Sequence, residues 1–257
     1  MTGLFAILGL LWGSFANVVI YRLPEHKSVV FPASRCRSCN RKLSWFENIP
    51  LLSFLFLGGK CRTCKSKISW RYPLVELIMG LGFAGLYSWH GLNADLLEHL
   101  ILFFGLVVVS FIDLDHMILP DVFTLSGIVI GLLGSLINPD RSFWDSLFGV
   151  LFGGGILWAI SYLYFVFRKQ EGMGGGDVKL LAWIGAVLGW QSIPFIVMAS
   201  CLIGLPVGVV LALNSEKGMQ TVIPFGPYLA LGAVLYIFGG NEFGQAYIRL
   251  FLPDLVH

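Results

Sequence analysis

Apolar stretches follow one another along almost the whole chain, and most are long enough to cross a lipid bilayer. We place eight of them at residues 3–21, 74–90, 97–112, 121–137, 144–167, 178–190, 192–212 and 221–239. The composition agrees, because 56% of the 257 residues are hydrophobic and only 12% are charged, about half the charged share of a soluble domain. The sequence therefore predicts an all-α polytopic membrane protein with about eight transmembrane helices.

Basic residues are concentrated in one segment between the first two apolar stretches. Of the 17 Lys and Arg residues, 11 lie between Arg22 and Arg71. The positive-inside rule places this segment in the cytoplasm, and alternation of the eight spans then puts both termini outside. Residues 1–23 are expected to form a retained first helix, 24–72 a cytoplasmic domain, and 73–257 a membrane-embedded domain. The amphipathic stretch 241–257 fits a position at the membrane interface.

Four cysteines in the basic segment form two CxxC motifs, Cys36 with Cys39 and Cys61 with Cys64. Each motif directs two thiolates toward one ion, and two motifs complete a tetrahedral structural zinc site. Two disulfides are the alternative, which a cytoplasmic location disfavours. The fifth cysteine, Cys201, lies in an apolar run and is expected in the core.

Two aspartates lie where apolar stretches meet water. Asp113 follows the third stretch, and Asp177 follows the glycine-rich segment 172–176. Carboxylates at membrane depth are costly and mark functional sites, and the span count brings both to the cytoplasmic side. A pair of packed carboxylates shares one proton and activates water, which is the chemistry of an intramembrane aspartic protease. The alternative is that these acids simply flank helices, as Asp115, Asp121 and Asp145 also do.

Two other classes of protein share some of these features. A small-solute transporter also has several spans and intramembrane acids, but it more often shows inverted repeats, which this sequence lacks. A zinc-ribbon sensor or scaffold explains the cysteines but not the two aspartates. Cleavage of a substrate by membranes containing the protein, and its loss on substitution of Asp113 or Asp177, distinguishes a protease from both.

Six segments together resemble the type IV prepilin peptidase family, the leader peptidases and N-methyltransferases of bacterial pilus and type II secretion systems. They are Gly13–Pro24, the paired CxxC motifs, Glu47–Ser53, Ile68–Glu76, Asp113–Asp121 and Gly174–Lys179. The last contains the GxGD signature of this class of intramembrane aspartyl protease. The resemblance covers nearly the whole chain.

The resemblance implies a function at the cytoplasmic face of the bacterial inner membrane. It implies that Asp113 and Asp177 are catalytic, with Gly174, Gly176, Asp115 and Lys179 in support. Substrates would be prepilins and type II secretion pseudopilins, cleaved after a glycine that ends a short basic leader. The new N-terminal residue would then be methylated with S-adenosylmethionine. We expect no nucleic-acid partner.

Several polar residues have an open role. Lys179 either orients or neutralises Asp177 or contacts a lipid headgroup, and His116 is read as a polar helix-end residue rather than a base. Asn17 is either a packing residue or a ligand-binding one. Glu76 is either a helix-end acid near Arg71 or, with Asn17, part of a methyl-transfer pocket in which its carboxylate assists the acceptor amine.

Overall fold

The computed structural model describes residues 1–169, 174–215 and 223–240. Within these ranges the regular structure is helical, apart from two isolated β-bridges. Each of the eight expected stretches corresponds to a helix, so the predicted all-α class is confirmed. These helices are α1 (Thr2–Arg22), α3 (Arg71–His90), α4 (Ala94–His116), α5 (Asp121–Gly134), α6 (Phe143–Arg168), α7 (Gly175–Leu188), α8 (Ser192–Asn214) and α9 (Gly226–Leu235). The stretch 241–257 lies outside the described residues.

The helices differ in length. Among the described residues, α1, α4, α6 and α8 are long and apolar enough to cross a membrane, and α5 and α9 are shorter apolar helices. Helix α7 has 14 residues, which corresponds to about 21 Å at 1.5 Å per residue. The hydrocarbon core of a bilayer is about 30 Å thick. Helix α7 is therefore shorter than the hydrocarbon core is thick.

Contacts divide the chain into two compact units, Met1–Ile112 and Asp113–His257. The boundary falls inside α4, whose last turn belongs to the second unit. The expected division at residues 23 and 72 rests on composition and stays a prediction.

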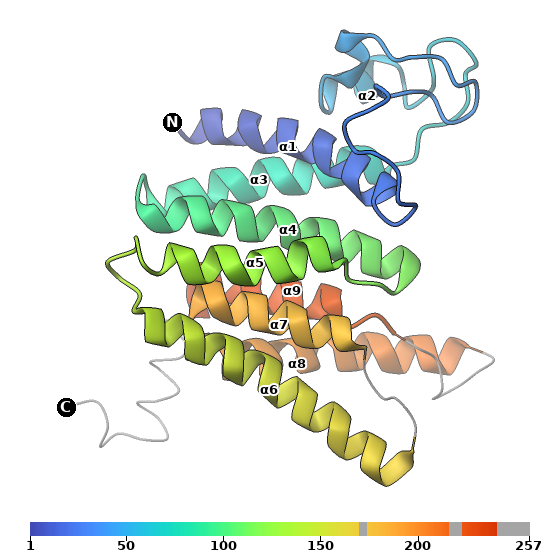
Figure 1. Ribbon diagram of the computed structural model, residues 1–257. Coiled ribbons are helices and arrows are strands. Elements are labelled where there is room, and N and C mark those ends of the chain that lie inside the picture. Colours follow the sequence, from blue (N-terminus) through green and yellow to red (C-terminus); the bar gives the residue numbers. More distant parts are fainter. Residues whose placement is uncertain (170–173, 216–222, 241–257) are drawn as a thin grey trace. The chain divides into compact units, whose positions relative to one another are not determined.

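The first unit is built on close packing of α1 along α3 (Figure 1). Glycines on α1 allow this approach, because a Cβ at Gly13 would lie 2.6 Å from the Cα of Glu76. The helices are also joined by stacked rings of Phe5 and Tyr87, whose centroids are 4.5 Å apart. Close contact through small residues is the usual packing mode of helices in lipid.

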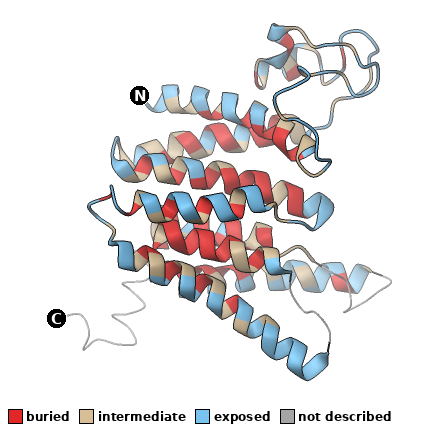
Figure 2. Ribbon diagram, viewed as in Figure 1, coloured by how far each residue is buried: buried red, intermediate tan, exposed pale blue. Residues whose placement is uncertain are grey.

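In the second unit, α7 is the most enclosed helix. Figure 2 shows it buried along nearly its whole length, and every residue from Leu180 to Val187 is buried. A helix that is apolar on all sides and buried forms the centre of a packed bundle. Helices α5, α6 and α9 pack against it. At the crossing with α6, Gly149 and Gly185 meet backbone to backbone, and neither position has room for a Cβ.

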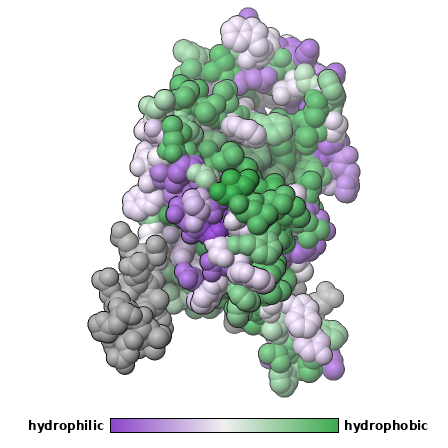
Figure 3. All heavy atoms as spheres, turned by 60° about the vertical axis from the view of Figure 1, so that its left-hand side comes forward, coloured by the Kyte–Doolittle hydropathy of each residue, from purple (hydrophilic) through white to green (hydrophobic). Residues whose placement is uncertain are grey.

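The outer surfaces of the helices are apolar. On the face drawn in Figure 3, hydrophobic side chains cover large continuous areas. Cys201 is on such a surface: it is exposed on α8, so the prediction that it lies in the core is wrong. The apolar run containing it faces outward, as expected where the surrounding medium is lipid rather than water.

Candidate active site and metal site

Asp113 lies in the last turn of α4, and only 4% of it is exposed. The sequence suggested that this helix ends near residue 112, but it continues to His116. Met117 then adopts a left-handed conformation with φ 54°, and its N–H donates to the carbonyl of Asp113 at 2.9 Å. This is a common way to end a helix. The extra turn keeps Asp113 on helical backbone, which fixes the direction of its side chain.

Asp177 lies in the first turn of α7. Gly174 is the N-cap of that helix, and the backbone N–H of Asp177 donates to its carbonyl at 3.2 Å. The residue is 9% exposed, and its Oδ1 atom has no hydrogen-bond partner among the described residues. A buried carboxyl oxygen without a hydrogen-bond donor is unusual. In the described part of the chain, no contact that stabilises the fold explains why this acid is buried, so Asp177 is a candidate functional residue.

A third segment, the start of α9, reaches Asp113. The backbone N–H of Gly226 donates to Oδ2 of Asp113 at 3.1 Å, and this bond is buried. A Cβ at Gly226 would lie 2.7 Å from that same oxygen and 3.1 Å from Leu119. Leu119 also packs against Gly176, where a Cβ would lie 2.9 Å from the Leu119 side chain. Leu119 therefore lies between two glycines that belong to the first turns of α7 and α9.

The structure thus brings together the two aspartates expected from the sequence. Leu119 links them, because a Cβ at Gly176, next to Asp177, and one at Gly226, which binds Asp113, would each lie within 3.1 Å of its side chain. The two acids are 64 positions apart in the sequence. Sequence reasoning missed Gly226 and Leu119. A glycine between an aromatic residue and a proline at the start of an apolar helix, in Pro224–Pro227, was the available signal for Gly226.

The other residues expected at this site lie at its edge. Lys179 is 2.5 Å from Oδ1 of Asp121, so it forms an ion pair between the N-terminal ends of α7 and α5. Both partners are partly exposed, and exposed pairs contribute little stability. Asp115 and His116 are exposed. Unlike Gly176, Gly174 has no close neighbour among the described residues, because the nearest of their atoms to a Cβ there would be 4.0 Å away.

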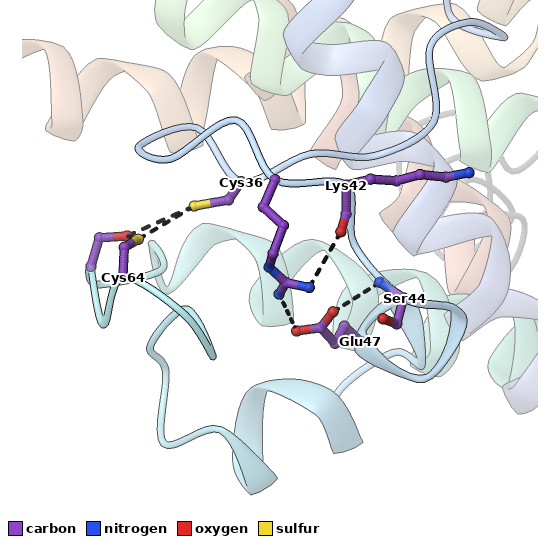
Figure 4. Close-up of polar contacts among 7 residues, drawn as sticks. Cys36, Lys42, Ser44, Glu47 and Cys64 are labelled. Atoms are coloured by element: carbon purple, nitrogen blue, oxygen red, sulfur yellow. Dashed lines mark hydrogen bonds and ion pairs between the residues drawn. The ribbon is translucent and has the colours of Figure 1, made fainter.

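The four CxxC cysteines form a single cluster in the first unit. Their sulfur atoms all lie within 4.8 Å of one another, and the sulfurs of Cys36 and Cys64 are 3.8 Å apart. Tetrahedral zinc with bonds of about 2.3 Å holds its sulfur ligands about 3.8 Å apart. The four thiols are free, and the spacing of their sulfurs fits one zinc ion. Figure 4 shows the sulfur of Cys36 directed toward Cys64.

The two CxxC motifs have the same local backbone. In each, the first cysteine and the residue five positions later are joined by a backbone hydrogen bond of 2.9 Å, Cys36 to Arg41 and Cys61 to Ser66. The residue after the second cysteine, Asn40 or Lys65, has a positive φ. Backbone N–H groups of Cys39 and Ser38 donate toward Cys36 and lower the pKa of its thiol to about 6. Donors of this kind favour the thiolate that binds a metal.

Next to the cysteines, an ion pair braces the domain. Arg41 donates to Glu47 at 2.6 Å, and the second oxygen of Glu47 accepts from the N–H of Ser44 at 2.8 Å (Figure 4). The Glu47 side chain is only 2% exposed, and Arg41 lowers its pKa to about 2. Buried, hydrogen-bonded pairs of this kind are strongly destabilising to break.

Asn17 and Glu76 both lie at the α1–α3 contact. Asn17 donates to the carbonyls of Gly13 and Tyr72 at 3.2 and 3.1 Å. Glu76 is 8% exposed, and its Oε2 accepts the N–H of Leu51 at 2.8 Å. Each residue therefore has a visible structural contact, and Glu76 attaches the cysteine domain to α3.

The fold and these sites define a helical membrane protein with two buried aspartates and a tetracysteine domain. Residues 7–90 match the model of the Bacterial Peptidase A24 N-terminal domain, and residues 100–209 match that of the Type IV leader peptidase family. The chain belongs to the type IV leader peptidase family.

Three relatives that match over nearly the whole chain carry the same name, prepilin leader peptidase/N-methyltransferase. A protein of Pseudomonas aeruginosa is 39% identical over 95% of this chain and 92% of its own length. One of Aeromonas hydrophila is 38% identical over 96% and 93%, and one of Xanthomonas campestris pv. campestris is 37% identical over 94% and 92%. No solved structure matches the chain.

Proposed function

We propose that this protein removes the leader peptide of type IV prepilins and type II secretion pseudopilins and methylates the N-terminal residue that cleavage exposes. The names of its relatives support both activities. The observation that supports the peptidase assignment is that Asp113 and Asp177, from separate helices, are both buried and are linked through Leu119 and Gly226.

The dyad activates water directly, without a covalent intermediate. One ionised aspartate takes a proton from water as its oxygen attacks the scissile carbonyl carbon. The other, protonated, donates to the carbonyl oxygen. Because the carboxyls are largely withdrawn from solvent, their interactions with the developing charges are stronger than they would be in water.

The glycines before Asp177 favour an extended substrate. No described atom lies within 4 Å of where a Cβ would stand at Gly175, and Gly174 is almost as open. A peptide must be extended to expose its scissile bond, and the bare backbone here allows one to approach the carboxylate.

We place this chemistry at the cytoplasmic face. The basic segment between Arg22 and Arg71 precedes α3, which leads away from that face, and α4 leads back to it and ends just beyond Asp113. The tetracysteine domain and the dyad then lie on the same side of the membrane, by the positive-inside rule.

The peptidase assignment is tested by two single substitutions. Asp113→Asn and Asp177→Asn preserve shape but remove the ionisable group, so each should abolish cleavage of a prepilin in membranes while the protein remains inserted. Asp140→Asn is the matched control, because Asp140 is exposed in a turn remote in sequence from both acids. Full cleavage by either dyad variant contradicts the proposal.

For methylation we propose the junction of α1, α3 and the cysteine domain, where Asn17 and Glu76 lie. S-adenosylmethionine supplies the methyl group. The Glu76 carboxylate has acceptor capacity beyond its bond to Leu51, so it can hold the acceptor ammonium and assist loss of the proton that blocks attack. Asn17 orients the adjoining backbone.

Two substitutions separate this role from a structural one. Glu76→Gln keeps an oxygen that accepts from Leu51 but removes the charge, whereas Glu76→Ala removes both. Glu76→Gln should lower methylation of a pre-cleaved substrate and leave leader removal intact, while Glu76→Ala should also loosen the cysteine domain. If Glu76→Gln methylates at the normal rate, the methyl-transfer pocket does not lie at this junction.

A further inference from the structure

The two aspartates of the dyad have different surroundings. Oδ2 of Asp113 accepts the buried N–H of Gly226. Oδ1 of Asp177 is buried and has no hydrogen-bond partner among the described residues. A donor stabilises the ionised form of a carboxylate, whereas a carboxyl buried without donors favours its neutral form. When two such groups share one proton, the environment decides which of them holds it.

The donor is well placed for this purpose. Gly226 is the first residue of α9, and N–H groups at a helix start are unpaired within the helix and carry partial positive charge. The next residue, Pro227, has no N–H, and the N–H of Tyr228 donates to Phe225 at 3.1 Å. Among the first three positions of α9, Gly226 is therefore the one whose N–H serves Asp113.

We propose that Gly226 is a positioning residue that assigns the roles within the dyad, which extends the peptidase function proposed above. Its N–H keeps Asp113 ionised as the base, and Asp177 carries the shared proton as the acid. The requirement for glycine follows from space, because a Cβ at residue 226 would lie 2.7 Å from the carboxylate oxygen that the N–H holds.

The assignment gives a balanced reaction. Asp113 takes one proton from water while the water oxygen bonds to the scissile carbon, and Asp177 gives its proton to the carbonyl oxygen. The C–N bond then breaks as the nitrogen takes the proton from Asp113. One hydroxyl of the tetrahedral intermediate returns a proton to Asp177 as the carboxylic acid product forms. The dyad ends with the protonation it began with.

The first experiment labels the wild-type protein in membranes with dicyclohexylcarbodiimide, which reacts with protonated carboxyl groups in apolar surroundings. Peptide mass spectrometry then locates the adduct. The two acids are almost equally buried, at 4% and 9% exposed, so protonation rather than access should decide the site. We expect the adduct mainly on Asp177. Labelling of Asp113 to an equal or greater extent overturns the role assignment, and this result requires no variant to fold.

The second experiment uses Gly226→Ala, with Gly155→Ala as the control because no atom of the described residues lies within 4 Å of a Cβ at Gly155. The added methyl must move the Asp113 oxygen from 2.7 Å to ordinary contact at 3.4 Å or beyond. A misplacement of about 1 Å can lower a rate on the order of 100-fold. We expect kcat for leader cleavage to fall by about 10-fold to 100-fold with KM unchanged, and carbodiimide labelling to increase at Asp113.

A structural role for Gly226 would lower the amount of folded protein without moving the label between the aspartates. A wild-type kcat in Gly226→Ala, or a fall without any change in labelling, overturns the proposal. Failure of the wild-type protein to cleave a prepilin, or cleavage that survives Asp113→Asn, is a different result, because it refutes the peptidase function itself.

Discussion

Removal of one zinc ligand should unfold the tetracysteine domain while leaving the membrane helices in place. Between residues 24 and 70, the buried residues are Glu47, Pro50, Phe54 and Cys61. Burial of the one large apolar side chain, Phe54, contributes about 2 kcal/mol. Zinc binding to four thiolates contributes about 10–16 kcal/mol in zinc-finger peptides. A zinc ion held by the four cysteines would therefore be the dominant stabilising element of this domain.

The assay compares Cys39→Ser with Cys201→Ser. The two changes are chemically identical, but Cys201 is exposed on α8 and lies outside the cluster. Purified wild-type protein and Cys201→Ser should contain about one zinc per chain, the stoichiometry of a four-cysteine site. Cys39→Ser should lose most of it. Trypsin should then cut Cys39→Ser rapidly within the basic segment 24–70, which the folded domain protects.

Two outcomes refute this reasoning. One is wild-type protein without zinc, with its four clustered cysteines paired as two disulfides under non-reducing conditions. The other is a Cys39→Ser protein that loses zinc yet resists trypsin as well as the wild type, since the fold would then not depend on the metal.

Three further predictions concern stability. Gly149→Ala forces α6 away from Gly185 and should cost about 1–3 kcal/mol, seen as a lower thermal midpoint in detergent; an unchanged midpoint refutes the close contact. Arg41 lowers the pKa of Glu47 from 4.5 to about 2, so this stabilisation is complete above pH 4.5 and is lost as the pH falls toward 2. Glu47→Gln should cost about 2 kcal/mol at neutral pH, and a deficit that persists at pH 2 contradicts an ionic role. Arg141 donates to carbonyls near the C-terminal ends of α5 and α7. Arg141→Ala should lower the thermal midpoint by the equivalent of about 1–3 kcal/mol, and an unchanged midpoint means that these two hydrogen bonds do not stabilise the fold.

Much of this architecture could be predicted from local patterns. Apolar stretches and turn residues predicted where the helices lie, because backbone N–H and C=O groups in lipid must form their hydrogen bonds within each segment. The repeated CxxC spacing predicted the cysteine cluster, since each motif is a self-contained turn. Asp113 and Asp177 stood out because charge is rare in apolar surroundings.

The contacts between distant segments could not be predicted in this way. The hydrogen bond from Gly226 to Asp113 joins residues 113 positions apart, and one sequence does not show which glycine lies beside which acid. The same holds for Lys179, which pairs with Asp121, and for the bond from Leu51 to Glu76. Such pairings are decided by helix packing, and packing depends on the whole set of side chains at each interface.

The backbone contact between Gly149 and Gly185 limits which amino-acid substitutions the crossing of α6 and α7 can accept. When a large and a small side chain face each other, enlarging one can be compensated by shrinking the other. Here neither residue has a side chain to remove, and the obstacle to any larger residue is the opposite backbone itself. No second substitution at the facing position can rescue the first. A double substitution at this pair should therefore be at least as destabilising as either single substitution. Neither glycine can be replaced by way of a compensating change at the other.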